Sequence, residues 1–178
     1  MKKTVQVLLA AYNGQDYLCE QLDSILAQKH VRVSLLVRND GSTDQTGRIL
    51  AAYEKKYPNI SVYTGKNIGA ARSFYHLLAN AGAGADYYAF ADQDDVWLED
   101  KLARAVRLLE KAGKKNLPLL YAGEAIYASR DLKHREAFAY QNRKSASFGN
   151  ALVENICMGC TQVFNRRLYQ LVRGHLPD

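Results

Sequence analysis

Three aspartates stand together near the middle of the chain, in the segment Asp92-Gln93-Asp94-Asp95. They directly follow the apolar residues 87–91, which have the length and composition of a buried strand. Like charges this close repel one another and burial penalises them further, so the cluster needs a compensating cation. Carboxylate oxygens are the ligands that hard divalent ions such as Mg²⁺ and Mn²⁺ prefer. Taken alone, however, three acidic residues are more simply explained as a solvated turn that caps the next helix.

The elements around this cluster help to decide between the two explanations. In the first half of the chain, apolar segments of strand length alternate with segments whose apolar residues recur at helical spacing. The pattern predicts strands at residues 5–10, 31–38, 60–63 and 87–91, and helices at 16–28, between the turn at 40–45 and Pro58, and at 70–81. Continuous apolar strands covered by amphipathic helices are typical of parallel sheets. We therefore predict an α/β fold in which a mostly parallel, Rossmann-like sheet is flanked by helices in three layers.

The second half of the chain is less regular. We predict a helix at 98–112, a strand at 117–127, loops with one short strand at 129–150, a strand at 160–164 and a last helix at 166–173. In the turn at 40–45, Ser42 is expected to be the N-cap of the following helix, with Gln45 completing a capping box. A chain of 178 residues can bury one sizeable core, so we expect a single domain over residues 1–178.

The charge balance narrows the classes of partner. The net charge is +6, and a basic surface attracts nucleic acids, anionic membranes or phosphorylated substrates. No motif of a nucleic-acid-binding module accompanies the charge, so we do not expect a nucleic-acid partner. No apolar run approaches the roughly 20 residues that cross a bilayer, so we expect a cytoplasmic protein, with peripheral association at the inner face of the membrane left open. Cys19, Cys157 and Cys160 fit neither a disulfide framework nor a zinc site and are expected to be structural.

Polar residues follow each of the first four predicted strands. Tyr12 and Asn13 follow the first strand, residues 39–41 the second, residues 67–69 the third and residues 92–95 the fourth. The carboxyl ends of parallel strands meet at one edge of a sheet, where α/β proteins bind their ligands. Turn chemistry would explain Asn, Asp and Gly at any one of these places, but not at all four. We therefore expect a ligand site at this edge, and the aspartates make a metal-chelated diphosphate the best candidate.

Two common kinds of phosphate site are disfavoured by the sequence. No G-x-G-x-x-G segment follows the first strand, and no P-loop lysine motif is present. The pair of glycines at 82 and 84 precedes a strand instead of opening a helix. Dinucleotide cofactors and P-loop nucleotide hydrolysis are therefore not expected.

The chain resembles the family 2 inverting glycosyltransferases, which have a GT-A fold, in its motifs at residues 7–13, 39–44, 67–69 and 92–95. The Asp-Gln-Asp-Asp-Val-Trp form of the last motif, together with residues 155–165, is similar to the bacterial rhamnosyltransferase branch. The resemblance covers essentially the whole chain. Its motifs are weak singly and specific together, in this order and spacing.

The resemblance implies a set of site residues. It places the nucleotide base near Tyr12 and Asp40, the ribose at Asp92 and the metal, Mg²⁺ or Mn²⁺, at Asp94. The carboxylate of Asp40 could accept the N3–H of uracil or thymine, which cytosine lacks. Arg72 resembles an arginine that reaches the nucleotide, whereas Asp95 is expected to support the site or cap the next helix. The full nucleotide-sugar-binding set is Ala11, Tyr12, Asn13, Asp40, Asn67, Gly69, Arg72, Asp92 and Gln93.

Two of these assignments have plain alternatives. Tyr12 could cap the core at the end of a strand, and Arg72 could be a solvated arginine on a helix surface. Gly159 and Cys160 resemble the loop that lines the acceptor side, and neither is expected to be catalytic.

The resemblance also implies a reaction. A sugar, with L-rhamnose suggested by the branch, would pass with inversion from a dTDP- or UDP-sugar to a glycan or lipid-linked acceptor of a cell-surface polysaccharide. Inversion needs a general base that removes the proton of the acceptor hydroxyl. In relatives this base is an aspartate beyond the Gly-Cys-Thr segment, and no residue here matches it, so we expect it beyond Asp178. The chain would then be the donor-binding part of a longer enzyme, and a non-catalytic nucleotide-sugar-binding fragment is the alternative.

Overall fold

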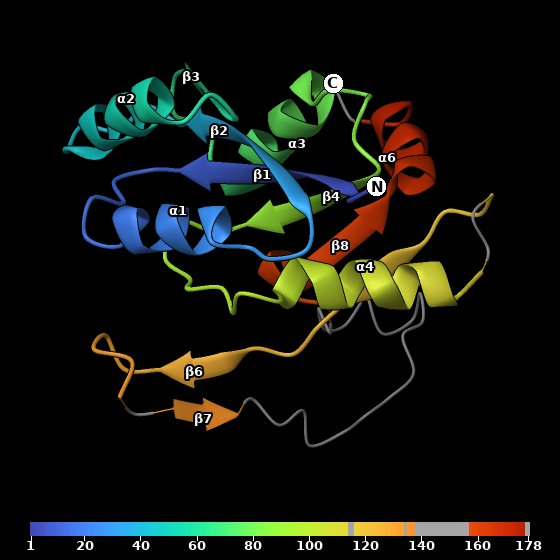
Figure 1. Ribbon diagram of the computed structural model, residues 1–178. Coiled ribbons are helices and arrows are strands. Elements are labelled where there is room, and N and C mark those ends of the chain that lie inside the picture. The colour runs from blue at the N-terminus through green and yellow to red at the C-terminus, as the bar shows by residue number, and fades with distance from the viewer. Residues whose placement is uncertain (114–115, 134, 138–156, 177–178) are drawn as a thin grey trace.

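The computed structural model describes residues 1–113, 116–133, 135–137 and 157–176 (Figure 1). Its main feature is a six-stranded sheet with the strand order β3-β2-β1-β4-β8-β5. The first four strands in this order run parallel, and β8 runs antiparallel to both of its neighbours. In Figure 1 the arrowheads of β1 and β4 point to the same side and that of β8 points the other way. The strands are β1 (Thr4–Ala11), β2 (Arg32–Asn39), β3 (Ile60–Thr64), β4 (Tyr87–Ala91), β5 (Leu120–Ala122) and β8 (Gln162–Asn165).

Helices cover both faces of the sheet, as the sequence predicts for a three-layer α/β fold. The helices are α1 (Leu18–Leu26), α2 (Thr46–Lys56), α3 (Ala70–Asn80), α4 (Lys101–Lys111) and α6 (Arg166–Arg173). Apolar side chains of α1, α2 and α4 join one core cluster, and those of α3 and α6 join a second cluster on the opposite face. Strand β1 serves both clusters, because Val5, Val7 and Leu9 face the first and Leu8 the second. These four side chains are completely buried, and each such burial stabilises the fold by about 1.5–3 kcal/mol.

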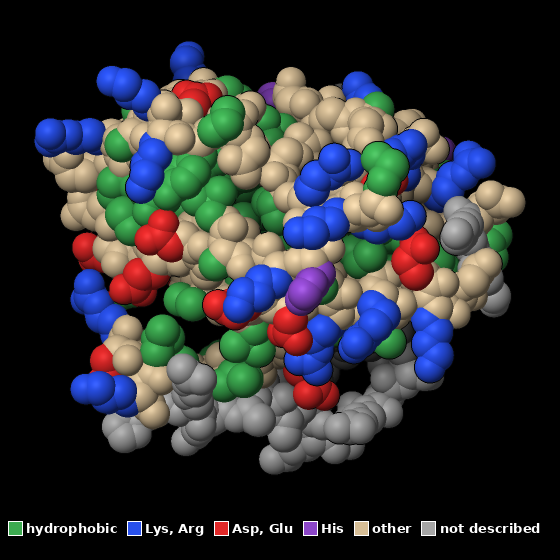
Figure 2. Space-filling model, viewed as in Figure 1, with side chains coloured by type: hydrophobic (Ala, Val, Ile, Leu, Met, Phe, Trp, Pro, Cys, Tyr) green, Lys and Arg blue, Asp and Glu red, His purple; other side chains and the backbone are tan. Residues whose placement is uncertain are grey.

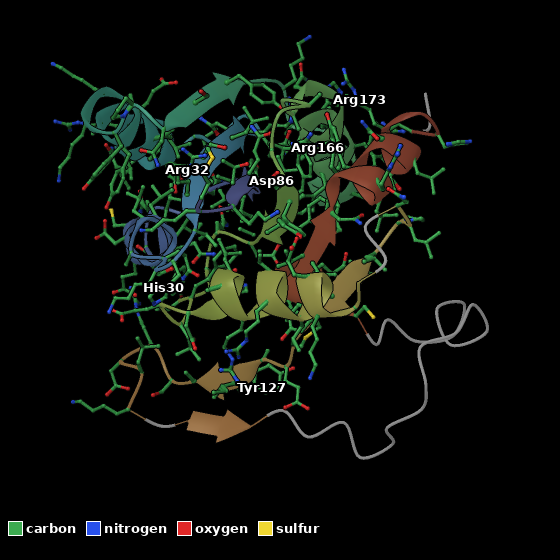
Figure 3. All side chains as sticks on the ribbon, turned by 45° about the vertical axis from the view of Figure 1, so that its right-hand side comes forward. His30, Arg32, Asp86, Tyr127, Arg166 and Arg173 are labelled. Carbon is green, nitrogen blue, oxygen red and sulfur yellow. The ribbon has the colours of Figure 1, made fainter. Side chains whose placement is uncertain are left out.

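Acidic and basic side chains meet at the edge of the sheet where the parallel strands begin. A cavity of about 430 Å³ lies here, and four of its charged residues form two ion pairs. Lys3 Nζ lies 3.4 Å from Glu110 Oε1, and Arg166 Nη2 lies 3.5 Å from Asp86 Oδ1. Figure 3 shows Arg166 and Asp86 close together near the ends of β8 and β4. In Figure 2, lysine and arginine side chains are spread over the visible face, including the side where α6 and the N-terminus lie. These ion pairs join α6 and α4 to the sheet, at the edge away from the polar strand ends.

The region from 117 to 128 differs from the prediction. We predicted one strand at 117–127, but the structure has two, β5 and β6 (Ile126–Ala128), in different sheets. Strand β5 pairs with β8, whereas β6 pairs with β7 (Arg135–Ala137) in a separate two-stranded sheet. The chain leaves the main sheet at Gly123, whose N–H donates to the Thr161 carbonyl. Figure 3 shows Tyr127 of β6 beneath α4.

The loops predicted at 129–150 are described in part. Strand β7 lies within this stretch, and residues 138–156 lie outside the described residues. None of the helices in the described ranges combines the length and the apolar character that crossing a membrane requires.

Candidate functional site

A pocket of about 580 Å³ lies at the carboxyl ends of β1, β2 and β4. Of the ten residues that the sequence assigned to nucleotide, sugar and metal, it brings together eight. Asn13 and Arg72 are the two that do not line it. The lining residues are Ala10, Ala11, Tyr12, Asp40, Asn67, Gly69, Ala70, Ser73, Phe74, Asp92, Gln93 and Asp94.

Asn13 belongs to a set of hydrogen bonds that joins the loop after β1 to the loop after β2. Its backbone is in the left-handed region, with φ of 49°, and its Oδ1 accepts a hydrogen bond from the Thr43 N–H at 2.9 Å. The Asn13 N–H in turn donates to Ser42 Oγ at 3.1 Å, and the Gly14 N–H donates to Thr46 Oγ1 at 2.8 Å. Ser42, Thr43 and Thr46 thus hold the loop that follows Tyr12, and none of the three lines the pocket.

These hydrogen bonds between the two loops explain why the predicted capping box is wrong. We expected Ser42 to be the N-cap of the second helix, with Gln45 completing the box, but α2 begins at Thr46 and Gln45 makes no side-chain cap. Ser42 Oγ is occupied by the Asn13 N–H, while Asp44 Oδ1 accepts from the Thr46 N–H at 2.9 Å. The competing loop contact therefore overrides the local capping pattern.

The side chain of Gln93 holds the backbone of Tyr12 with two hydrogen bonds. Its Oε1 accepts from the Tyr12 N–H at 2.8 Å, and its Nε2 donates to the Tyr12 carbonyl at 3.0 Å. Gly14 leaves room for the Gln93 amide group, because a Cβ at position 14 would stand only 2.3 Å from Gln93 Oε1. The aromatic side chain of Tyr12 remains 46% exposed at the pocket, so one of its faces is available to a flat ligand.

The acidic loop and the residues that follow it, 92–102, are held by polar side chains of α1 and of Gln28, just after its end. Gln21 is completely buried, and its Nε2 donates to the Asp92 carbonyl at 2.8 Å. Ser24 Oγ accepts from the Trp97 N–H at 3.0 Å. Gln28 donates to the Leu98 carbonyl at 2.7 Å and accepts from the Leu102 N–H at 3.0 Å. Because buried polar groups need partners, these contacts fix the path of the loop.

Carboxylates crowd in this loop, as the sequence predicted. Oxygens of Asp92 and Asp95 and the Sγ of Cys160 lie within 4.8 Å of one another. Burial, then the neighbouring charges of Asp95 and Asp94, raise the pKa of Asp92 above its ordinary value. Burial likewise raises the pKa of Asp95, although the Cys160 thiol and Lys101 oppose it. Both carboxylates are therefore destabilised in their charged form, which a cation would relieve.

Lys101 supplies one positive charge beneath the cluster. Its Nζ donates to the Cys160 carbonyl at 2.5 Å and lies 3.4 Å from the centre of the Trp97 ring. Burial lowers the pKa of Lys101 to about 7, against the attraction of Asp95, Cys160 and Asp92. The lysine thus joins the acidic loop to the turn η1 (Gly159–Thr161), which carries the predicted acceptor-side residues.

Asp94 is the exposed member of the cluster and lines the pocket. Crowding makes these carboxylates costly to ionise, and a hard divalent cation, which prefers oxygen ligands, would stabilise their charged form. Asp95 does not line the pocket, and the prediction that it caps the next helix is wrong. That helix, α4, begins at Lys101 with Asp100 at the N-cap position, because residues 96–100 first complete the loop over α1.

The opposite wall of the pocket is built around Asp40, which is only 3% exposed. Oδ1 accepts from Arg38 Nη2 at 2.9 Å, and Oδ2 accepts from the Gly69 N–H at 3.0 Å. The Ile68 N–H lies 3.1 Å from each oxygen. Burial acts to raise the pKa of Asp40, but the hydrogen bonds from Ile68, Arg38 and Gly69 outweigh it and hold the pKa below its ordinary value. The group is therefore an ionised acceptor.

Arg72 lies outside this wall. It is exposed on α3 and does not line the pocket. Its assignment to the nucleotide rests on the sequence resemblance and stays a prediction.

Several positioning residues were not predicted, although most of them left a signal in the sequence. Gln21 and Ser24 lie on the buried face of α1 and Gln28 just after its end, where a polar residue in an apolar stripe signals a specific contact. Arg38 interrupts an otherwise apolar strand two residues before Asp40. Lys101 gave no such signal, because a lysine in the first turn of an amphipathic helix is ordinary.

Comparison with known proteins agrees with this arrangement. The family described as "Glycosyl transferase family 2" matches residues 6–172. The dTDP-rhamnosyl transferase RfbG of Shigella flexneri is 39% identical over 105 residues, which are 57% of this chain and 36% of RfbG. TuaG of Bacillus subtilis, a glycosyltransferase named for teichuronic acid biosynthesis, is 32% identical over 163 residues, which are 91% of this chain and 62% of TuaG. The chain thus spans between about a third and three fifths of the length of these two relatives.

Solved structures agree with the fold. S. aureus TarS 1–349 in complex with UDP-GlcNAc superposes with a TM-score of 0.68 at 20% identity, over 98% of this chain and 47% of that one. The mannosyltransferase PcManGT of Pyrobaculum calidifontis, in complex with GDP-Man and Mn²⁺, gives 0.55 at 25% identity, over 61% of this chain and 33% of that one. The α/β architecture predicted from the sequence is confirmed. With a family match over nearly its whole length and a GT-A-like fold, the chain belongs to glycosyl transferase family 2.

Proposed function

We propose that the pocket binds a dTDP- or UDP-sugar, and that the whole protein transfers the sugar with inversion to a glycan or lipid-linked acceptor of a cell-surface polysaccharide. One observation carries the proposal. An exposed aromatic ring, a buried ionised carboxylate and a cluster of crowded carboxylates converge on one pocket at the carboxyl edge of the sheet. A nucleotide sugar offers a counterpart to each of them: a flat base, an N–H donor on that base, and a ribose with a metal-bound diphosphate.

The base would lie between Tyr12 and Asp40. Tyr12 has a free aromatic face on which a base can stack, and such stacking contributes about 1–3 kcal/mol. Asp40 is ionised, so it can accept the N3–H of uracil or thymine and offers nothing to the N3 lone pair of cytosine. Asn67 and Gly69 would complete the wall beside the base.

The diphosphate would lie on the acidic side. Asp92 would accept a ribose hydroxyl, and Asp94, exposed at the pocket, would hold Mg²⁺ or Mn²⁺. When bound, the ion would neutralise charge on the departing nucleoside diphosphate. The Mn²⁺ present with GDP-Man in PcManGT supports this choice of ion.

The sugar and the acceptor are inferred from relatives. L-Rhamnose is favoured by the 39% identity to RfbG, a dTDP-rhamnosyl transferase, and a cell-surface polysaccharide by the match to TuaG. We assign the general base of the inverting reaction to none of the described residues. Donor binding is therefore proposed for this chain and transfer for the whole protein.

The test is a calorimetric titration of UDP and dTDP in Mn²⁺ and in EDTA. We expect binding only with the divalent ion, and Asp94→Ala should abolish it. Asp100→Ala is the matched control, because Asp100 is equally exposed but lies outside the pocket, and it should bind like the wild-type protein. Binding that is the same in EDTA would refute the metal role, and no binding of either nucleotide would refute the donor site.

A thermal-shift comparison would then identify the sugar. The donor that binds the folded protein most tightly raises its melting temperature most at equal concentration. We expect dTDP-rhamnose in Mn²⁺ to give a larger shift than UDP-glucose or UDP-galactose. A larger shift with either UDP-hexose would overturn the assignment of rhamnose while leaving the pocket intact.

A further inference from the structure

Arg38 is a buried cation inside the wall of the nucleotide pocket. It lies on β2, and its side chain is only 5% exposed. Its Nη2 donates to Asp40 Oδ1 and to the Lys66 carbonyl, both at 2.9 Å, and its Nε donates to Ser73 Oγ at 3.3 Å. The guanidinium also lies over the ring of Tyr63, 5.8 Å from its centre. One side chain therefore connects β2, the loop after β3, and α3.

The loop after β3 is shaped to admit this guanidinium. A Cβ on Gly65 would stand 2.6 Å from Arg38 Nη1 and 2.8 Å from Nη2, so only glycine leaves room for the charged group. The same loop also lies close to Gly41, because a Cβ on Gly41 would stand 2.9 Å from the Asn67 backbone nitrogen. Two glycines thus let the loop close over the Arg38–Asp40 pair.

The hydrogen bonds of Asp40 leave a defined place for a ligand. An ionised carboxylate has about four lone-pair positions. In this structure, Arg38 takes one, the Gly69 N–H takes another, the Ile68 N–H is shared between the two oxygens at 3.1 Å from each, and the Ser73 side chain also hydrogen-bonds to the carboxylate. A shared hydrogen bond is weaker than an unshared one, so an N–H of the base can take one of the two places of the Ile68 N–H without displacing Arg38 or Gly69.

We propose that Arg38 is the positioning residue that sets the base selectivity of the pocket, by fixing Asp40 as an oriented acceptor for the N–H of a uracil or thymine base. The inference rests on the proposed function and goes beyond it, because Arg38 does not line the pocket and would act through Asp40. Arginine suits this role because its guanidinium stays charged and presents several donors in a fixed plane. A lysine would present its donors from a single nitrogen, whereas Arg38 reaches Ser73 through Nε and both Asp40 and Lys66 through Nη2.

A purely structural role for the ion pair is the competing explanation. Replacing a buried ion pair by apolar groups is often neutral or even stabilising, so stability alone is a weak reason for this arrangement. The two explanations differ in what they predict for ligands. A structural role changes folding and lowers the affinity for all nucleotides alike, whereas a positioning role changes the ratio between uridine and cytidine nucleotides.

The experiment measures UDP and CDP binding by calorimetry, in Mn²⁺, for the wild-type protein and three variants. Arg38→Met removes the cation. Gly65→Ala keeps every charge, and its Cβ would stand 2.6 Å from Arg38 Nη1, so the guanidinium must move away from its place beside Asp40. Gly84→Ala is the matched control, since nothing lies within 4 Å of a Cβ at that position.

We expect the wild-type protein and Gly84→Ala to prefer UDP over CDP by on the order of 100-fold, the effect of one unpaired buried acceptor. In both Arg38→Met and Gly65→Ala the ratio should fall at least tenfold, mainly through weaker UDP binding. If Arg38→Met does not fold, Gly65→Ala alone decides. An unchanged ratio in a folded Gly65→Ala protein, or a wild-type protein that binds UDP and CDP equally, overturns the role of Arg38. A wild-type protein that binds neither UDP nor dTDP instead overturns the proposed function.

Discussion

Replacing Asp95 by asparagine should stabilise the protein when divalent ions are absent. Oxygens of Asp92 and Asp95 lie within 4.8 Å of each other. Two unit charges at that separation repel by about 0.9 kcal/mol in bulk water and by about 3.5 kcal/mol at an effective dielectric constant of about 20. The loop is partly exposed, so solvent screens the repulsion, and the attraction of Lys101 and the Cys160 thiol opposes it. We therefore expect Asp95→Asn to gain about 1–2 kcal/mol at pH 7.

The dependence on pH follows mainly from the burial of Asp95, to which the neighbouring charge of Asp94 adds. The pKa of Asp95 is raised above 3.8 in the folded protein, so the folded state holds this proton more tightly than the unfolded chain. A carboxyl group shifted in this direction favours folding at low pH, and that contribution is lost as the pH rises through the raised pKa. The advantage of Asp95→Asn should therefore be full at pH 7 and shrink as the pH falls towards 3.8.

The assay is urea unfolding in EDTA, followed by tryptophan fluorescence. Trp97 is the single tryptophan of the chain and lies buried in the acidic loop, so its signal reports on this site. Asp100→Asn is the control, because Asp100 is exposed and, among the described residues, forms an ion pair with Arg104 alone, at 3.8 Å, so the change should alter stability by less than about 0.5 kcal/mol. An Asp95→Asn protein that is less stable than wild type by about 1 kcal/mol would show that its bonds to Lys101 and Cys160 outweigh the repulsion.

Three further predictions test the pocket and the core. Tyr12→Ala should weaken UDP binding by about 5- to 150-fold, the value of one base-stacking contact, with a melting temperature close to wild type. Gly14→Ala should weaken UDP binding several-fold in the same titration, because its Cβ would stand 2.3 Å from Gln93 Oε1 and drive that side chain off the Tyr12 backbone. Leu102→Ala should lower the free energy of unfolding by about 2–5 kcal/mol in urea, whereas Leu98→Ala, at a position that is 56% exposed, should lower it by less than about 1 kcal/mol.

The strands and the edge of the ligand site could be predicted because their signals are local. Each buried strand is an apolar run, and each site segment is a group of polar or turn-forming residues directly after such a run. The direction of parallel strands then places Tyr12, Asp40 and Asp92 at one edge without any knowledge of their distances. The eight predicted residues that line the pocket all belong to these segments.

The rest depends on contacts between segments that are distant in sequence. Ser42 has the residue type of an N-cap, and only the fold shows that the Asn13 N–H takes its oxygen. Lys101 has the pattern of a helix surface, and only the fold shows that it reaches the carbonyl of Cys160. The residues at 117–127 have the apolar pattern of a single strand. In the fold, pairing with β8 ends at Ala122, so the strand stops before Gly123 and the following residues join a different sheet.

The place of β8 in the sheet has a consequence for the order in which the protein is made. Strands β1 to β4 are joined by helices in compact units, so they can assemble as soon as they leave the ribosome. Their sheet then ends at β4, whose outer edge stays unpaired until β8, Gln162–Asn165, has been synthesised much later. An unpaired edge of apolar residues is a template for pairing with other chains. Late synthesis of β8 therefore makes β4 the point at which a nascent or shortened chain would self-associate.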